Sequence, residues 1–423
     1  MGPRGGPVMR VILHCDANGF YASCELVERP ALRGLPVSVG GDPEARHGIV
    51  LASSQEAKRA GVKTGMVLWQ ARQLCPQLII LPPNFRLYMH MSRRLRHMYE
   101  EYSPKVESYG LDECWVDLTS RGVDLEDGRQ IADTLRKRAW DELGLTLSVG
   151  VSWNKIFAKL GSDYKKPDAT TLITPDNYRQ VVWPLPAGDL LFIGPRTVPK
   201  LRRRGVSTIG DIAALPRDTL AGWFGKVGVM HHIHARGEDE SPVMPVGFET
   251  AIKSVGNSTT TPQDMETPED VRCVITLLAE SVARRLREAG LKGRCVNIHV
   301  RDTALRTAGC QKTIPYDTAL SGDIIKTAMG LFEERGYAVM LPLRSIGVSV
   351  SSLVQASAPV QQDLFGFAGK REKQEDLAKA VDSIRQRFGT QAIMRGNVLG
   401  NAAFSGINPH DDHTIHPVPF YSG

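Results

Sequence analysis

One short stretch, YGLDECWVDLT from Tyr109 to Thr119, constrains the fold more than any other part of the chain. Two adjacent carboxylates, Asp112 and Glu113, stand between β-favouring residues in a segment too apolar on both sides for a solvated loop. Because neighbouring side chains of a strand point to opposite faces, a sheet edge or a tight turn is needed for both acids to serve one site. Paired carboxylates near a core repel each other unless a divalent cation neutralises them. The alternative for this stretch alone is a hairpin turn with two solvated acids.

A second acid-bearing strand favours the metal site over the hairpin. Residues 11–16, VILHCD, form a short apolar run that ends in Asp16. One strand that delivers an acid at its end and another that delivers two together make an oxygen-rich pocket. Such pockets suit Mg²⁺, which prefers a few carboxylates together with water and substrate phosphates.

Length and composition limit the class of protein. A chain of 423 residues should divide into several domains, because single cores stop growing well below that size. With 42% hydrophobic and 23% charged residues, the chain is ordinary for a soluble globular protein. The net charge of +6 favours a polyanionic partner, although many unrelated proteins are mildly basic.

The cysteines and the apolar runs indicate a cytoplasmic location. Seven cysteines occur singly, without a CxxC spacing, which argues against both a disulfide framework and a zinc site. The start of the chain lacks an apolar core of signal-peptide length, and no run approaches the ~20 apolar residues that a membrane-spanning helix needs. We therefore expect neither secretion nor membrane insertion.

Helical and strand patterns alternate along the chain. Helices that alternate with antiparallel strands indicate an α+β fold. The expected helices span 20–27, 54–60, 85–102, 127–143, 154–166, 271–289 and 370–388, and the expected strands span 37–40, 48–52, 145–152, 295–301 and 345–350.

The composition changes beyond residue 184. Residues 189–212 are typical of a helix-hairpin-helix, a motif that binds DNA phosphates through backbone N–H groups and helix N-termini. The alternative is a plain pair of helices with an exposed arginine run. Residues 238–245 are charged, contain proline and lack periodicity, so they are expected to form a linker.

Three motifs, CDANGFYASCE, GLDECWVDLT and GVSWNKIFAKLGSDYKKPDATT, resemble in sequence and order those of the Y-family of translesion DNA polymerases. The resemblance covers about residues 10–365 and implies a monomeric right-hand polymerase that acts on primer-template DNA and deoxynucleoside triphosphates. It implies a palm over 1–20 and 87–176, fingers over 21–86, a thumb over 177–242, a linker over 243–248, a little finger over 249–355 and a tail over 356–423.

The resemblance also implies a catalytic centre. Asp16, Asp112 and Glu113, with the carbonyl of Ala17, would hold two Mg²⁺ ions ~3.5–4 Å apart for nucleotidyl transfer without a protein general base. Where the family has Ser two residues before the paired acids, this chain has Gly110.

Four further residues match nucleotide-binding positions of the family. Phe20 and Tyr21 match its sugar-facing aromatic pair, with Tyr21 as the steric gate that excludes a 2′-hydroxyl. Lys58 and Lys166 match lysines that reach the triphosphate. The alternatives are core packing for Phe20 and ordinary helix-surface charges for the lysines. At a neighbouring phosphate-contacting position, where the family often has Tyr, this chain has Gln55.

A short tail motif resembles the family's sliding-clamp peptide. Gln361, Leu364 and Phe365 would dock in the clamp, the β subunit, with Gln362 as the second choice for the anchoring amide. Further on, three histidines lack acid or thiol partners and are read as tail residues rather than a metal site: His410, His413 and His416.

Two other functions are considered. A nucleotide cyclase can share a palm-like fold and two-metal carboxylates, but it would not need a helix-hairpin-helix or a second DNA-gripping domain. A catalytically inactive Y-family-like protein could bind DNA as an accessory factor. All three expected acids are present, which favours the active polymerase.

Overall fold

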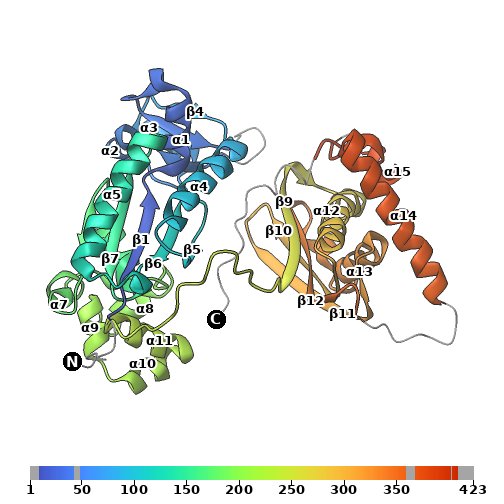
Figure 1. The fold of residues 1–423 in the computed structure, drawn as a ribbon. Helices are drawn as coiled ribbons and strands as arrows, with labels where there is room; N and C mark the ends of the chain where they lie inside the picture. Colours follow the sequence, from blue (N-terminus) through green and yellow to red (C-terminus); the bar gives the residue numbers. More distant parts are fainter. Residues whose placement is uncertain (1–8, 42–47, 359–366, 402, 408–423) are drawn as a thin grey trace. The chain divides into compact units, whose positions relative to one another are not determined.

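The computed structural model describes residues 9–41, 48–358, 367–401 and 403–407. They form two compact units that divide between Glu249 and Thr250. Sheets and helices in both units confirm the predicted α+β class (Figure 1). No helix in the described ranges has the length and apolar character needed to cross a bilayer. Short 3-10 turns lie at Pro30–Leu32, Thr119–Arg121, Ala187–Asp189, Tyr337–Met340 and Thr390–Ala392.

The first unit is built on a five-stranded sheet in the order β5-β6-β1-β7-β8. Its central strand, β1, pairs antiparallel with β6 and β7, and β7 pairs parallel with β8. The buried apolar residues of β1 and β7 explain why they lie in the centre of the sheet. The strands are β1 (Ile12–Ala17), β5 (Val106–Ser108), β6 (Glu113–Asp117), β7 (Leu147–Ser152) and β8 (Thr170–Leu172).

Helices cover both faces of this sheet. On one face, Leu13 of β1 packs in a core with residues of α4 (Phe85–Glu100) and α5 (Leu125–Leu143). On the other face lies α6 (Lys155–Tyr164), whose Ala158 packs with Ile12. The alternation of strand side chains thus places His14 and Asp16 on the α6 side.

A smaller three-stranded sheet, β3-β2-β4, adjoins the large one in sequence. Strand β2 pairs antiparallel with β3 and parallel with β4 around a small apolar core of its own. The predicted helices and strands of this region are confirmed within two residues. The elements are α1 (Phe20–Glu28), β2 (Val37–Gly40), β3 (Val50–Ser53), α2 (Gln55–Arg59), α3 (Leu68–Leu74) and β4 (Ile79–Leu81).

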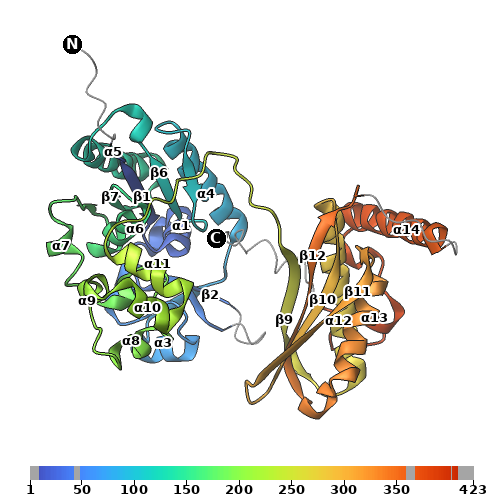
Figure 2. The same ribbon diagram turned by 90° about the horizontal axis from the view of Figure 1, so that it is seen from below.

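Short helices follow the large sheet and lie together in both views (Figures 1 and 2). Helices α8 and α9 flank a turn at Gly205, and the side chain of Thr208 caps α9 by accepting from the Asp211 N–H. The segment expected to be a helix-hairpin-helix therefore consists of short helices around tight turns. The elements are α7 (Tyr178–Val181), α8 (Val198–Arg202), α9 (Ile209–Ala214), α10 (Arg217–Phe224) and α11 (Lys226–Ala235).

The expected linker is largely attached to the first unit. Val243 is 1% exposed and packs beside Trp115. The Met244 N–H donates to Glu107 at 2.9 Å, and the Val246 N–H donates to the Pro104 carbonyl at 3.0 Å. The chain without periodicity is thus fixed by specific contacts as far as Val246.

The second unit is a four-stranded antiparallel sheet, β11-β10-β12-β9, with α12 and α13 on one face (Figure 1). The burial of β9 alternates along its first eight residues, as expected for a strand with one covered face. The predicted helix over 271–289 is confirmed. The elements are β9 (Ser254–Met265), α12 (Pro268–Glu288), β10 (Leu291–Asp302), β11 (Thr307–Thr318), α13 (Ser321–Glu334) and β12 (Leu343–Gln355).

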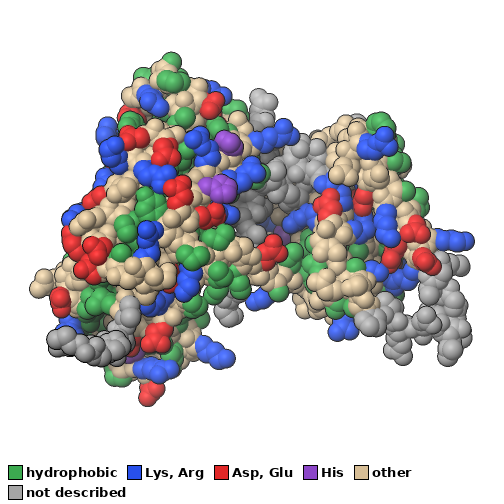
Figure 3. Space-filling model, viewed as in Figure 1, with side chains coloured by type: hydrophobic (Ala, Val, Ile, Leu, Met, Phe, Trp, Pro, Cys, Tyr) green, Lys and Arg blue, Asp and Glu red, His purple; other side chains and the backbone are tan. Residues whose placement is uncertain are grey.

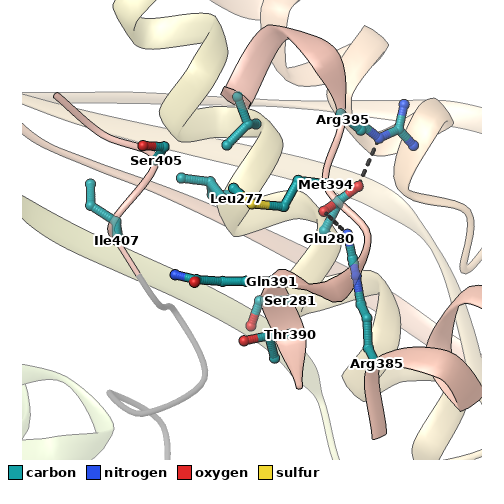
Figure 4. A pocket seen from close by; sticks show the side chains of 11 residues that line it. Leu277, Glu280, Ser281, Arg385, Thr390, Gln391, Met394, Arg395, Ser405 and Ile407 are labelled. Atoms are coloured by element: carbon teal, nitrogen blue, oxygen red, sulfur yellow. Dashed lines mark hydrogen bonds and ion pairs between the residues drawn. The ribbon is translucent and has the colours of Figure 1, made fainter. Parts of the chain in front are cut away.

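Part of the expected tail packs on this second unit. Helix α14 (Phe367–Phe388) contacts α12 and its surroundings through ion pairs, including Arg287 with Asp382 at 2.7 Å. Glu280 of α12 accepts from both Arg385 and Arg395, as Figure 4 shows. The short helix α15 (Gly396–Leu399) and the residues that follow it bury Val398 and Phe404 in the same core.

Candidate active site

The pairing of β1 with β6 brings the predicted acids together. Asp16 lies directly opposite Glu113 in the antiparallel register, and the Ala17 N–H donates to the Asp112 carbonyl at 3.0 Å. Directly opposed residues of an antiparallel pair place their side chains on the same face. Asp16 is buried, and the side chain of Glu113 is 19% exposed. Strands β5 and β6 do form a hairpin, but neither Asp112 nor Glu113 is an exposed residue, so the alternative of two solvated acids is wrong.

The turn before β6 explains the glycine at position 110. Gly110 has φ 92°, a left-handed conformation that favours glycine, and the Tyr109 N–H donates to the Glu113 carbonyl at 2.7 Å to close the turn. A Cβ at position 110 would lie 3.3 Å from Asp112 Oδ1. Glycine thus suits the backbone conformation that precedes the paired acids.

The three acids share one electrostatic environment. Burial, and then the charges of Asp16 and Glu113, raise the pKa of Asp112 to about 7. Glu113 Oε2 is buried and has no hydrogen-bond partner of good geometry within the described residues. Buried carboxylates that repel one another are the donor set that a divalent cation neutralises, so the residues fit Mg²⁺ chemically.

Two lysine side chains form ion pairs with these acids. Lys159 Nζ, from α6, lies 3.3 Å from Asp16 Oδ2 and 3.0 Å from Glu113. Lys166 Nζ lies 2.6 Å from Asp16 Oδ2. Within the part of the chain that the structure describes, no three His, Cys, Asp or Glu side chains are arranged to hold a metal ion as they stand. The ammonium groups of Lys159 and Lys166 therefore lie next to Asp16.

Asp163 completes this cluster. Its Oδ2 lies 3.3 Å from Lys159 Nζ, and its Oδ1 lies 2.7 Å from Lys166 Nζ. Burial alone would lower the pKa of both lysines, but the surrounding carboxylates more than offset it and raise the pKa of each. Sequence reasoning missed Lys159 and Asp163. Their i,i+4 spacing on the predicted helix was the available signal.

His14 supports Glu113 from beneath. It is fully buried, with Nδ1 2.9 Å from Ser162 Oγ and Nε2 3.3 Å from Glu113 Oε2. Burial, followed by the charge of Lys159, holds the pKa of His14 well below its usual value. Neither His14 Nε2 nor Glu113 Oε2 makes a hydrogen bond of good geometry within the described residues, so the imidazole is a close neighbour of the carboxylate. Sequence reasoning also missed this residue.

Lys58 reaches the site from the small sheet. Gly19 has φ 56° and turns the chain from β1 into α1, where a Cβ would lie 2.9 Å from the Ser53 carbonyl oxygen and 3.7 Å from Lys58 Nζ. Burial, and then the charge of Lys166, lower the pKa of Lys58. The Lys58 ammonium therefore lies close to the β1–α1 turn, although the residue as a whole is exposed.

The two aromatic residues after Gly19 have different surroundings. Phe20 is 2% exposed and belongs to the core. Tyr21 is partly buried and stacks on Tyr88, with ring centroids 4.4 Å apart and an interplanar angle of 11°. Tyr88 is itself held by a hydrogen bond from its hydroxyl to Glu25 at 2.7 Å. Burial, and then the Asp112 charge, raise the pKa of Tyr21.

Charge is mixed on the face of the molecule that the space-filling view shows (Figure 3). On the face seen in Figure 3, Lys and Arg side chains alternate with acids on both units. The predicted clamp-binding residues Gln361, Leu364 and Phe365 lie outside the described residues, as do the three tail histidines.

Two family models match the chain. Residues 15–163 match the impB/mucB/samB family, and residues 252–364 match the impB/mucB/samB family C-terminal domain. The first match includes every acid and lysine of the site except Lys166.

Curated relatives match most of the chain. DNA polymerase IV of Acetivibrio thermocellus is 44% identical over 94% of this chain and 100% of its own length. DNA polymerase IV of Moorella thermoacetica is 40% identical over 92% of this chain and 96% of its own. DNA polymerase IV 1 of Bacillus subtilis is 36% identical over 92% of this chain and 93% of its own length.

Solved structures share the fold. A Y-family DNA polymerase chimera of Dbh and Dpo4 superposes with a TM-score of 0.70 at 22% identity, over 82% of this chain and 99% of its own. A Dbh ternary complex superposes with a TM-score of 0.56 at 22% identity, over 81% of this chain and 98% of its own.

Proposed function

Because this chain belongs to the impB/mucB/samB family, the Y-family DNA polymerases, we propose that it adds deoxynucleotides to a primer 3′ end by metal-dependent nucleotidyl transfer at Asp16, Asp112 and Glu113. It is a DNA-directed DNA polymerase, as its relatives at 36–44% identity are. Residues 1–20 and 87–176 would be the palm and 21–86 the fingers. Residues 177–242 would be the thumb, 243–248 the linker and 249–355 the little finger.

The observation that carries this proposal is the cross-strand apposition of Asp16 and Glu113, with Asp112 one residue before β6. The three acids and the Ala17 carbonyl would hold two Mg²⁺ ions. When bound, these ions lower the pKa of the primer 3′-hydroxyl and neutralise the triphosphate. The raised pKa of Asp112 is compatible with this role, because it reflects burial first and then repulsion from Asp16 and Glu113, which a bound cation would relieve.

The remaining side chains bind and select the nucleotide. Lys58 and Lys166 supply positive charge beside the acids, where the phosphates would lie. Tyr21 is fixed by stacking on Tyr88, so its ring can exclude a ribose 2′-hydroxyl by contact. Phe20 supports Tyr21 from the core, with the two ring centroids 5.9 Å apart. Its role is packing behind the gate.

The family supports three further properties. The enzyme would copy damaged templates with low fidelity, as a cytoplasmic monomer. Gln361, Leu364 and Phe365 would bind the sliding clamp through an amide anchor and two apolar side chains. Primer-template DNA would be held by phosphate contacts that are independent of sequence.

An isosteric change at one acid tests the proposal. Asp112→Asn keeps the shape of the side chain but removes a charge from the metal-binding set, so single-nucleotide incorporation should fall by roughly 10²-fold or more. Primer-template affinity, measured by fluorescence anisotropy, should stay within about twofold because phosphate contacts lie elsewhere.

Three results would contradict it. Normal extension by Asp112→Asn would remove the acid from the catalytic centre. If the unaltered protein binds primer-template DNA but never extends it, the accessory DNA-binding role is favoured instead. Conversion of nucleoside triphosphate to a cyclic nucleotide without template would favour the cyclase.

A further inference from the structure

Lys159 lies at the centre of a cluster of carboxylates. Its ammonium contacts three carboxylates from three elements: Asp16 of β1 at 3.3 Å, Glu113 of β6 at 3.0 Å and Asp163 of α6 at 3.3 Å. The side chain of Lys159 is only 12% exposed. Two of these acids belong to the proposed metal-binding set, and the third does not.

The Lys159 ammonium offsets a charge repulsion that arises from the strand register. Asp16 and Glu113 are directly opposed, and like charges in that arrangement destabilise a strand pair. Lys159 lies within 3.3 Å of both acids, and Lys166 lies 2.6 Å from Asp16, so the lysine charges offset this repulsion. Before any cation binds, Lys159 is the group that joins the two strands' carboxylates.

The same ammonium would oppose a divalent cation. A cation and an ammonium cannot both take the facing oxygens of Asp16 and Glu113, so Lys159 must leave them when metal binds. Asp163 lies one helical turn further on α6, already within 3.3 Å, and its side chain is 48% exposed. It is therefore a partner to which Lys159 can turn with little movement of the helix.

We propose that Lys159 is a positioning residue that holds Asp16 and Glu113 together in the metal-free enzyme and transfers to Asp163 when a divalent cation takes its place. The inference rests on the proposed metal-dependent function and adds an exchange of partners at the same site. In this exchange, Asp163 is the ion-pair partner of the displaced Lys159 ammonium.

A static salt bridge is the competing account, and stability with and without metal separates the two. Lys159→Met should lower the thermal midpoint in EDTA, because it removes the ammonium shared by the opposed carboxylates and leaves only Lys166 on Asp16. Saturating Mn²⁺ should remove most of that deficit, since the cation then replaces the ammonium. A static bridge predicts the same deficit with and without Mn²⁺.

Lys155→Met is the matched control. Lys155 lies one turn earlier on α6, is 11% exposed and bridges Glu107 at 2.7 Å, but its ammonium makes no described contact with the proposed metal ligands. Its loss should lower the thermal midpoint equally in EDTA and in Mn²⁺. A deficit of Lys155→Met that disappears in Mn²⁺ would show that the assay does not report on the site.

Mn²⁺ affinity supplies an independent measurement. Electron paramagnetic resonance counts the free Mn²⁺. We expect Lys159→Met to bind Mn²⁺ about threefold to tenfold more tightly, because the competing ammonium is absent. Asp163→Asn, an exposed change that should fold, is expected to weaken binding by a similar factor because the ammonium loses its destination. In the double variant the effect of Asp163→Asn should vanish, as expected for coupled residues.

The outcomes are distinguishable from a failure of the proposed function. Additive effects in the double variant would reduce both residues to distant charges and overturn the inference, as would unchanged affinity in Lys159→Met. If Asp112→Asn binds Mn²⁺ as well as the unaltered protein does, the metal site itself is misassigned and the proposed function fails.

Discussion

A single methyl group at Gly150 should disturb the site through packing alone. Gly150 lies in the middle of β7, and α6 crosses the strand at this point. A Cβ there would lie 1.9 Å from the Ala158 carbonyl oxygen and 2.5 Å from the Ser162 N, both backbone atoms of α6. Helix α6 carries Lys159 and Asp163, so any retreat of the helix moves these residues away from Asp16 and Glu113.

The size of the effect follows from these distances. Ordinary contact of a Cβ begins at 3.4 Å, so Gly150→Ala requires α6 to retreat by about 3.4 − 1.9 = 1.5 Å. Overpacking costs about 1–3 kcal/mol, and we expect the upper end because backbone atoms cannot rotate away. The lost chain entropy of the unfolded glycine offsets only about 0.4–1 kcal/mol. A misplacement of about 1 Å can lower turnover by roughly 10²-fold.

Urea unfolding and single-nucleotide incorporation measure the two consequences. Gly222→Ala is the control, because Gly222 lies inside α10 with no atom within 4 Å of its added Cβ. That variant should gain about 0.5–1 kcal/mol of stability and keep its incorporation rate. Gly161→Ala should lose less stability than Gly150→Ala, since its Cβ would lie 3.0 Å from the Gly150 Cα.

Two results would refute this reasoning. If Gly150→Ala unfolds at the same urea concentration as the parent, α6 does not approach β7 as closely as described. If it loses stability yet incorporates nucleotides at the parental rate, the position of α6 does not control the site.

Two further predictions concern sugar selection and clamp binding. Tyr21→Ala should raise ribonucleotide incorporation strongly, since exclusion by a ring held against Tyr88 is steric. An unchanged preference for deoxyribonucleotides in a competition assay would leave Tyr21 as a packing residue. Joint replacement of Leu364 and Phe365 by Ala should abolish clamp-stimulated synthesis while the rate without clamp stays the same, because the two side chains supply most of the affinity. An equal loss without clamp would mean that the segment packs on the enzyme instead.

The placement of three acids at strand ends could be predicted from the sequence. Asp16 ends an apolar strand, and Asp112 and Glu113 begin another, so strand periodicity alone indicated that acids were carried to the edge of a buried sheet. The helices and strands of the small sheet could likewise be predicted within two residues, because their hydrophobic patterns are local. The α+β class followed from the same patterns.

The ion-pair network around those acids could not be predicted in the same way. Lys159 meets Asp16 across 143 positions of the chain, and His14 meets Ser162 across 148. The spacing of Lys159 and Asp163 on one helix was visible, but ordinary surface ion pairs have the same spacing. Only the register of β1 against β6, and the approach of α6 over Gly150, placed them on the proposed metal ligands.

The C-terminal region shows the same division. A helix over 370–388 was suggested by its pattern, and α14 confirms it. Its attachment was not predictable, because Arg385 and Arg395 find Glu280 more than 100 residues away, and charged helix faces usually remain in water. The sequence by itself determined which acids stand at strand ends and which segments form helices and strands. The tertiary structure decided which charges meet, because those contacts depend on strand register and close packing between distant segments.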